Sequence, residues 1–423
     1  MGVDVATYFG GVRVSVSNFG PVRRAELVAG DLTAVIGPNN VGKSWLASLI
    51  YAVHNLVFFH LPAIAHHALS EVGMRRCSGA GAECLREHLE EVERVALEMS
   101  KMSTGEALKR ELQSVLGTSD FVTYGEEEAI VEASAPSLEV SFKALLPRGE
   151  RPRVEVNISS SFVKRAVEDV EWAAFSARGA SLSFKGLLPM RRSVYIPAER
   201  IALLTAFYGV VEALIRLYGI SQVVREELPR QFFKPSLSLY AADVINLIRS
   251  GAVERVGGQF GGVETALLDG DVAVDRGTLA IVYEYASGLK LPAAFASSGV
   301  AQVAGLLLGL MVRRGDLAVV EEPEINLHAN RQVQVAELLA REARRRPLFV
   351  TTHSDLVVMK LAHLYAKGEV ESLRLYYLHD GELEELPVDR SGGVPEIKSI
   401  SSVIEELSGE ALELYAQLQR SVR

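Results

Sequence analysis

Residues 37–44 read Gly-Pro-Asn-Asn-Val-Gly-Lys-Ser. The apolar run at residues 32–36 comes directly before them and predicts a buried strand, and the helix expected next begins at Trp45. A strand, a glycine-rich loop and a helix N-terminus in this order are the context that a phosphate-binding loop needs. The arrangement predicts an α/β fold of the P-loop type with a site for a nucleoside triphosphate.

The spacing within the loop assigns a task to each part of it. Gly37 and Gly42 let main-chain N–H groups converge on phosphate oxygens, where the helix dipole adds partial positive charge. Lys43 can reach the β- and γ-phosphates, and the Ser44 hydroxyl can ligate Mg²⁺. Asparagine tolerates the left-handed backbone that such a loop requires. The expected nucleotide-binding residues are Gly37, Pro38, Asn39, Asn40, Val41, Gly42, Lys43, Ser44 and Trp45.

Length and composition bound the rest of the chain. The 423 residues suffice for two or three ordinary domains, or for one core with a large insertion. The net charge of −9 gives the whole molecule no attraction to nucleic acid or to an anionic membrane, and leaves a local basic patch open. Cys77 and Cys84 exclude a disulfide scaffold and fit a reducing compartment, and the N-terminus lacks a signal-peptide pattern. We therefore expect a cytoplasmic protein.

Residues 46–69 carry no Asp, Glu, Lys or Arg and are long enough to span a bilayer. The first third of this stretch must pack on the sheet, and Pro62 and four histidines interrupt the remainder. A buried helix followed by a connector is the interpretation, so no membrane partner is expected.

Periodicity divides the chain into a core and an inserted segment. Residues 12–36 alternate as an antiparallel pair does, residues 85–116 are helical with a break near 103–105, and residues 129–158 return to strand-like alternation. A strand at 193–197 brings the chain back to the core. The predicted organisation is the N-terminal part of the core at 1–53, an inserted α+β segment at 54–190 and the C-terminal part of the core at 191–423. Helices are expected at 200–218, 238–250, 300–313 and 400–418, and strands within 272–286, 374–378 and 382–386.

The segment 317–328 reads Leu-Ala-Val-Val-Glu-Glu-Pro-Glu-Ile-Asn-Leu-His. Four apolar residues followed by an acid predict a buried parallel strand with a carboxylate at its C-terminal end, where ligands bind in open α/β sheets. Glu321 would hold the Mg²⁺ hydration shell, and Glu322 would polarise the attacking water.

Two further segments complete a candidate site. A short apolar strand at 348–352 ends at His353, which could donate a hydrogen bond to the γ-phosphate. Ser297, Ser298 and Gly299 open a helix, where small polar residues form an anion site or simply a helix cap.

The order of these motifs resembles that of the ABC-class ATPases, and their wording resembles the stand-alone ATPases related to the OLD family, often labelled "AAA family ATPase". The resemblance covers about residues 1–53 and 191–360. The matching pieces are Asn18-Phe19-Gly20-Pro21-Val22, the loop at 37–44, Tyr195-Ile196-Pro197-Ala198-Glu199-Arg200, Ser297-Ser298-Gly299, Glu321-Glu322-Pro323-Glu324 with Leu327-His328, and Thr351-Thr352-His353-Ser354.

The resemblance implies a mixed-sheet core with an antiparallel β subdomain, and hydrolysis of ATP with Mg²⁺ in a head-to-tail homodimer. Ser297, Ser298 and Gly299 would meet the γ-phosphate on the second protomer. The general base would be Glu322, the switch His353, and Phe19 or its neighbours would lie near the adenine. Glu321 replaces a common Asp, the LSGGQ signature is absent, and no Q-loop glutamine follows residue 196, where Glu199 or Arg200 could substitute.

The absence of a transporter signature, of long coiled coils and of an appended Toprim nuclease indicates an ATPase switch whose output lies in a partner. That partner would be a protein effector, a nuclease or toxin in defence, or a DNA repair factor. One alternative is a DNA-binding clamp whose insertion contacts nucleic acid, and another is a nucleotide-regulated scaffold with little turnover.

Two side-chain clusters can be interpreted either as structural or as functional. His66, His67, Cys77, Cys84 and His88 match no common zinc module, and burial of the two cysteines as apolar residues is favoured. Four arginines close the helix after the paired acids, where they complement the helix dipole; a nucleic-acid patch is the less favoured reading. These arginines are Arg341, Arg344, Arg345 and Arg346.

Overall fold

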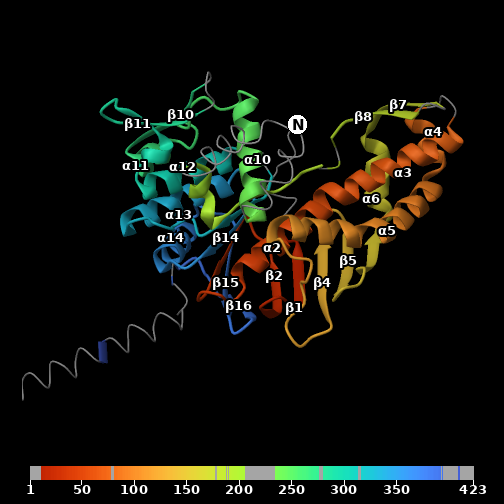
Figure 1. The fold of residues 1–423 in the computed structure, drawn as a ribbon. Coiled ribbons are helices and arrows are strands. Elements are labelled where there is room, and N and C mark those ends of the chain that lie inside the picture. Colours follow the sequence, from red (N-terminus) through yellow and green to blue (C-terminus); the bar gives the residue numbers. More distant parts are fainter. Residues whose placement is uncertain are drawn as a thin grey trace, which may run out of the picture.

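The computed structural model describes residues 11–77, 81–176, 179–186, 188, 190–204, 234–275, 280–312, 316–391, 393 and 408–409. Its centre is an 11-stranded mixed sheet in the order β6-β5-β4-β1-β2-β16-β15-β3-β14-β13-β9. Helices pack on both faces of the parallel part of this sheet, and a helical arm extends from one side (Figure 1). The predicted α/β class with a mixed sheet is confirmed.

The parallel strands form one end of the sheet, with β9 at its edge. They are β3 (Leu32–Ile36), β9 (Val194–Ile196), β13 (Ala318–Glu321), β14 (Leu348–Thr352) and β15 (Leu373–His379). Alternate residues of β3 enter opposite cores: Val35 packs with α2 (Lys43–Asn55) on one face, and Ala34 packs on the other face. Burial on both faces explains why these strands read as continuous apolar runs.

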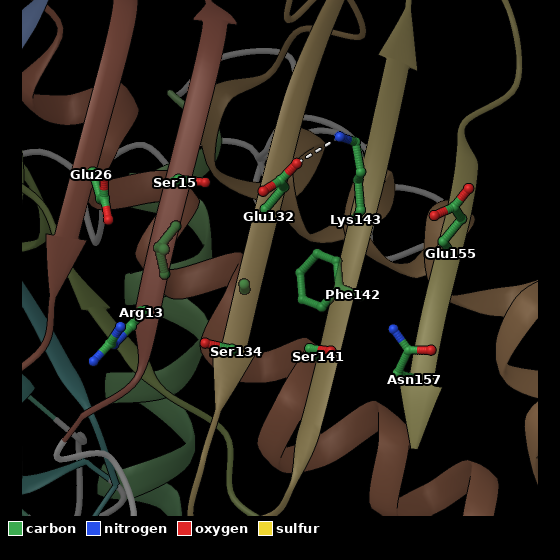
Figure 2. Close-up of a pocket in the computed structure, with 12 residues that line it drawn as sticks. Arg13, Ser15, Glu26, Glu132, Ser134, Ser141, Phe142, Lys143, Glu155 and Asn157 are labelled. Carbon is green, nitrogen blue, oxygen red and sulfur yellow. Dashed lines mark ion pairs between the residues drawn. The ribbon is translucent and has the colours of Figure 1, made fainter. Parts of the chain in front are cut away.

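The antiparallel strands form the other end of the sheet. They are β1 (Arg13–Phe19), β2 (Val22–Val28), β4 (Glu128–Ala135), β5 (Val140–Pro147), β6 (Arg153–Ile158) and β16 (Glu382–Leu386). Strand β4 pairs with β1, so part of the inserted segment 54–190 extends the core sheet itself. The face turned away from the arm helices is open and polar, and Figure 2 shows the ion pair between Glu132 and Lys143 on it, at 2.7 Å.

The helix that starts at the phosphate loop runs unbroken to the arm. It consists of α2, a π-helical turn η1 (Leu56–His60) and α3 (Leu61–Arg76). The expected connector after the first helix is therefore wrong. In the wide turn Leu61 N–H donates to Leu56 O, and this local widening of the continuous helix accommodates Pro62, which has no N–H. By length and composition this helix could cross a membrane, but 78% of its most apolar window is buried, as in a core helix.

The arm is built from helices and one hairpin. Its elements are α3, α4 (Ala82–Glu87), α5 (Leu89–Leu116), α6 (Ser160–Asp169), β7 (Val170–Ser176) and β8 (Gly179–Phe184). The predicted break near 103–105 is wrong, because α5 passes through it. Gly105 is there for close packing: a Cβ at this position would lie 2.8 Å from Val154 Cγ2 and 2.9 Å from Pro152 Cβ.

Cys77 and Cys84 form a disulfide between the end of α3 and α4, with their Cα atoms 6.0 Å apart. This corrects the expectation of two separate buried thiols in a reducing compartment. The bonded sulfurs are not thiolate ligands, and His66 instead pairs with Asp169 at 3.2 Å. Within the described residues no group of three or more His, Cys, Asp or Glu side chains could hold a metal ion, so the zinc reading has no support there.

The second core lies on the opposite face of the parallel strands. It contains α10 (Pro235–Arg249), α11 (Val263–Leu268), α12 (Ser298–Met311), α13 (Ala329–Ala343) and α14 (Asp355–Ala366). A small sheet of β10 (Gly270–Val274), β11 (Ile281–Tyr285) and β12 (Lys290–Pro292) adjoins it. Most of the helix expected at 200–218 and of the one expected at 400–418 falls outside the described residues.

The arginines at the end of α13 bind main-chain carbonyls of neighbouring segments. Arg341 donates to Gly261 O, Arg344 to Glu369 O and Arg345 to Gln259 O. Arg346 is buried and donates to Leu310 O and Val312 O. These contacts give the cluster a structural role, which differs from the expected interaction with the helix dipole.

Replacing Gly105 with alanine tests the packing of α5 on β6. Helix propensity alone would stabilise the protein by about 1 kcal/mol. The clash predicts a loss of about 1–3 kcal/mol, measured by denaturant unfolding. The control is Gly81→Ala, which should change stability little because the Cβ position of Gly81 has open space around it. A more stable Gly105→Ala protein would contradict the packing argument.

Candidate functional site

The loop after β3 has the backbone that phosphate binding requires. Asn40 has φ +64° and Gly42 has φ +108°, both in the left-handed region. A Cβ on Gly37 would lie 2.2 Å from the carbonyl oxygen of Leu378, so only glycine fits against β15. Gly42 gives the first turn of α2 no side-chain cap, which leaves its N–H groups for an anion. The expected left-handed conformation is thus found at Asn40.

The side chain of Lys43 folds back across the mouth of this loop. Its ammonium donates to Gly37 O at 2.9 Å and to Pro38 O at 2.6 Å. Burial lowers the pKa of Lys43 to about 8, and the nearby Glu322, Glu324 and Glu321 oppose that shift. The residue therefore presents a partly desolvated cation where the β- and γ-phosphates of a bound nucleotide would lie.

Strand register brings the other motifs to the same edge of the sheet. Strand β14 pairs in parallel with β3 and with β13, so that Thr352 lies opposite Ile36 and Thr351 lies opposite Glu321. The carboxyl ends of the three strands therefore coincide, and each is followed by one motif. These are the phosphate loop, the paired acids and His353.

His353 stands between Lys43 and Glu322. Its Nδ1 lies 3.5 Å from Lys43 Nζ, and its Nε2 lies 3.2 Å from Glu322 Oε1. Because an ammonium only donates, Nδ1 is the acceptor, and the ring proton is on Nε2, where it donates to Glu322. This hydrogen bond is the main reason that the pKa of Glu322 is lowered, which keeps the carboxylate ionised and able to accept a proton.

Glu324 fixes the main chain of His353. Its Oε1 accepts the His353 N–H at 2.7 Å, and burial raises the pKa of Glu324. In the sequence, Glu324 stood out only as part of the segment Glu321-Glu322-Pro323-Glu324 that carries the resemblance. Its position beneath the histidine shows a positioning role, for which its place two residues after Glu322 was the available signal.

Glu321 has the surroundings of a magnesium-binding carboxylate. Its side chain is buried, and neither carboxylate oxygen makes a hydrogen bond of normal geometry with the described residues. The hydroxyls of Ser44 and Tyr195 lie close enough to lower its pKa, but burial dominates and raises it. Hard oxygen donors in need of a cation are what Mg²⁺ prefers. Glu321 and Ser44 therefore fit the ion, which would neutralise phosphate charge when bound.

The signature residues and Phe19 lie elsewhere. Ser297 and Ser298 are exposed at the start of α12, and a Cβ on Gly299 would lie 3.2 Å from Asn326 O, in the loop after the paired acids. Phe19 is fully buried, packed edge-on against Trp45 with ring centroids 5.3 Å apart. Because its ring is buried, Phe19 cannot itself contact a base, and it packs against Trp45 instead. That Phe19 or its neighbours lie near the adenine stays a prediction.

The two candidates for a Q-loop substitute differ in exposure. Glu199 is about half exposed and pairs with Lys234 at 3.0 Å. Arg200 is completely buried and binds main-chain carbonyls, so it cannot touch a nucleotide. Sequence reasoning missed this structural use of Arg200, although the string that contains it was among the pieces that carried the resemblance.

Comparison with known proteins gives a family and distant structural likenesses. The chain resembles the SMC head domain from Thermotoga maritima, with 16% identity and TM-score 0.36, over 89% of this chain and 98% of that one. It also resembles the recombination mediator RecF bound to ATPγS, described as part of the RecFOR pathway, with 14% identity and TM-score 0.35, over 90% and 100% of the two chains. No curated protein matches the sequence.

The pattern of one protein family matches residues 137–359, more than half of the 423-residue chain. The match includes Arg200, Glu321, Glu322 and His353, and the phosphate loop precedes it. The chain belongs to the AAA-domain family described as "AAA domain, putative AbiEii toxin, Type IV TA system".

Proposed function

We propose that this protein is a Mg²⁺-dependent ATPase that dimerises head to tail on ATP and thereby switches a protein effector, a nuclease or toxin. The observation that carries the proposal is the cluster of Lys43, His353 and Glu322 at one sheet edge, beside the buried carboxylate of Glu321. Cation, base and metal-ligand candidates meet where the phosphate loop ends, which is the set that phosphoryl transfer needs.

The chemistry assigned to these residues is hydrolysis of the terminal phosphoanhydride. Glu322 accepts a proton from water as the water oxygen bonds to the γ-phosphorus, and the bond from that phosphorus to the β,γ-bridging oxygen breaks. Lys43 exchanges its bonds to Gly37 O and Pro38 O for phosphate oxygens. His353 holds the carboxylate of Glu322 in place through Nε2–H. Its Nδ1 lies 3.5 Å from the Lys43 ammonium, so it can respond when phosphate leaves that ammonium.

Exposure of the signature segment supports completion of the site by a second copy. Ser297 and Ser298 face solvent, and two large apolar side chains that precede them in the chain are exposed as well: Phe295 at 76% and Leu289 at 56%. Protein–protein interfaces typically combine exposed aromatic side chains at the centre with polar groups at the rim, and this segment offers both. The dimer proposed from the family resemblance would cover this surface.

The two alternatives have less support. The DNA-clamp alternative needs free basic side chains on the insertion, whereas Arg76, Arg94 and Arg153 there pair with carboxylates of Glu91, Glu98 and Glu128. The scaffold reading needs no ionised base, and Glu322 is kept ionised beside His353. The cytoplasmic location expected from the sequence is not supported by the disulfide between Cys77 and Cys84, because disulfides persist mainly in oxidising compartments.

Lys43→Ala removes the cation from the phosphate loop and should weaken ATP binding on the order of 100-fold, because charged hydrogen bonds contribute about 1.5–3 kcal/mol each. Isothermal titration calorimetry with the non-hydrolysable analogue AMP-PNP and Mg²⁺ measures the effect. The control is Lys143→Ala on the open sheet face, which should bind as the wild type does (Figure 2). Unchanged affinity in Lys43→Ala would reject the loop assignment.

Glu322→Gln keeps the shape of the side chain and removes its basicity. ATP binding should persist, phosphate release should fall by about 100-fold or more, and the ATP-bound dimer should accumulate. Light scattering with and without Mg-ATP measures the mass, and a phosphate assay measures turnover. Glu26→Gln, on an exposed carboxylate of the open sheet face, controls for loss of charge. Turnover near the wild-type rate would place the base elsewhere.

A further inference from the structure

The guanidinium of Arg200 is buried where three segments of the core meet. Its Nε donates to Gln302 O at 3.2 Å, and Nη1 donates to Pro197 O at 3.2 Å and Glu321 O at 2.9 Å. Nη2 donates to Glu322 O at 3.0 Å and Pro323 O at 3.2 Å. A guanidinium has five N–H donors, so every donor of Arg200 is used, and every acceptor is a main-chain carbonyl.

Burying the charged guanidinium of Arg200 costs free energy, so its hydrogen bonds must offset that cost. The side chain of Arg200 has no exposure, and burial lowers its pKa to about 10, so the group stays charged at neutral pH. A charge taken out of water is tolerated only with complete hydrogen bonding. The buried arginine therefore fixes five main-chain carbonyls that belong to three segments.

One of the segments carries the proposed base in an unusual conformation. Glu322 has φ +41°, which is disfavoured for a residue with a Cβ and must be stabilised by its surroundings. Its N–H donates to Thr351 O at 2.8 Å, and its carbonyl accepts from Arg200. Arg200 thus holds the turn that aims the Glu322 carboxylate at His353.

Another segment is the first half of α12, the helix opened by Ser297, Ser298 and Gly299. Gln302 lies in its second turn, and a Cβ on Gly305 would lie 3.3 Å from Arg200 Cγ, so the stem of the arginine lies against this helix. A rigid-body displacement of the start of α12 therefore acts on the same guanidinium that holds Glu322.

We infer that Arg200 is a positioning residue that couples the signature end of α12 to the orientation of Glu322. The inference rests on the proposed function, since contact of the signature residues with ATP on a second copy is the event that would be transmitted. Arg200 touches neither nucleotide nor water; it acts through the main chain of residues 321–323. In this proposal Arg200 transmits the contact made by the signature residues and does not itself sense the nucleotide.

The test is Arg200→Lys, because an ammonium has three donors and leaves at least two of the five carbonyls unpaired. We expect ATP affinity within about threefold of the wild type and kcat reduced about 100-fold, the effect of a misplaced catalytic group. Hydrogen exchange measured by mass spectrometry should be faster in peptides that contain residues 321–325. This second readout needs no turnover, so it remains decisive if the wild type shows no ATPase activity and the proposed function fails.

The matched control is Arg346→Lys. Arg346 is equally buried and donates to carbonyls of the far end of α12, at Leu310 and Val312, away from the site. This variant should lose a comparable amount of thermal stability while kcat and exchange at 321–325 stay within about threefold of the wild type.

Two results would overturn the inference: normal kcat and normal exchange at 321–325 in Arg200→Lys, or equal losses in Arg346→Lys. If Arg200→Lys does not fold, Gly305→Ala decides, because its new methyl would lie 3.3 Å from Arg200 Cγ and press on the Arg200 stem without removing a donor. A drop in kcat with unchanged ATP affinity in that variant supports coupling through Arg200, and an unchanged kcat contradicts it.

Discussion

The parallel register of β3, β14 and β13 is the constraint on which the rest of the site depends. Pairing of Ile36 with Thr352 and of Thr351 with Glu321 makes the three strands end together. The phosphate loop, the paired acids and His353 then share one edge without any long loop to position them. A slip by one residue would turn these side chains to the wrong face and separate the motifs.

Below this edge, the site is held by the main chain more than by side-chain pairs. Arg200 and Glu324 fix the backbone of the acid turn and of His353 respectively, and both are buried. Hydrogen bonds to both the carbonyl and the N–H of Glu322 stabilise its strained backbone, with φ +41°. The same helix that begins at Lys43 continues through a π-helical turn as α3 into the arm, so the phosphate loop and the arm are joined by one continuous helix.

The sequence predicted the fold class, the succession of strand, glycine loop and helix at the phosphate site, and the motifs that follow the buried strands, because buried strands and glycine loops leave local patterns. It failed where tertiary packing decides. Gly105 looked like a helix break but allows close contact with β6, and Phe19, expected with its neighbours near the adenine, is itself part of the core. Pro62 was accommodated by a π-helical turn, and the bond between Cys77 and Cys84 depends on how α3 and α4 are placed. Neither has a signature in residue spacing.

The central claim is that two copies complete one hydrolytic site, and the dependence of the rate on protein concentration tests it most directly. Phosphate release per protomer is measured with saturating Mg-ATP over a range of protein concentrations, with the mass followed in parallel. The account predicts a rate per protomer that rises with concentration and reaches a plateau as the dimer forms. A constant rate per protomer across concentrations at which the protein is a monomer would contradict it.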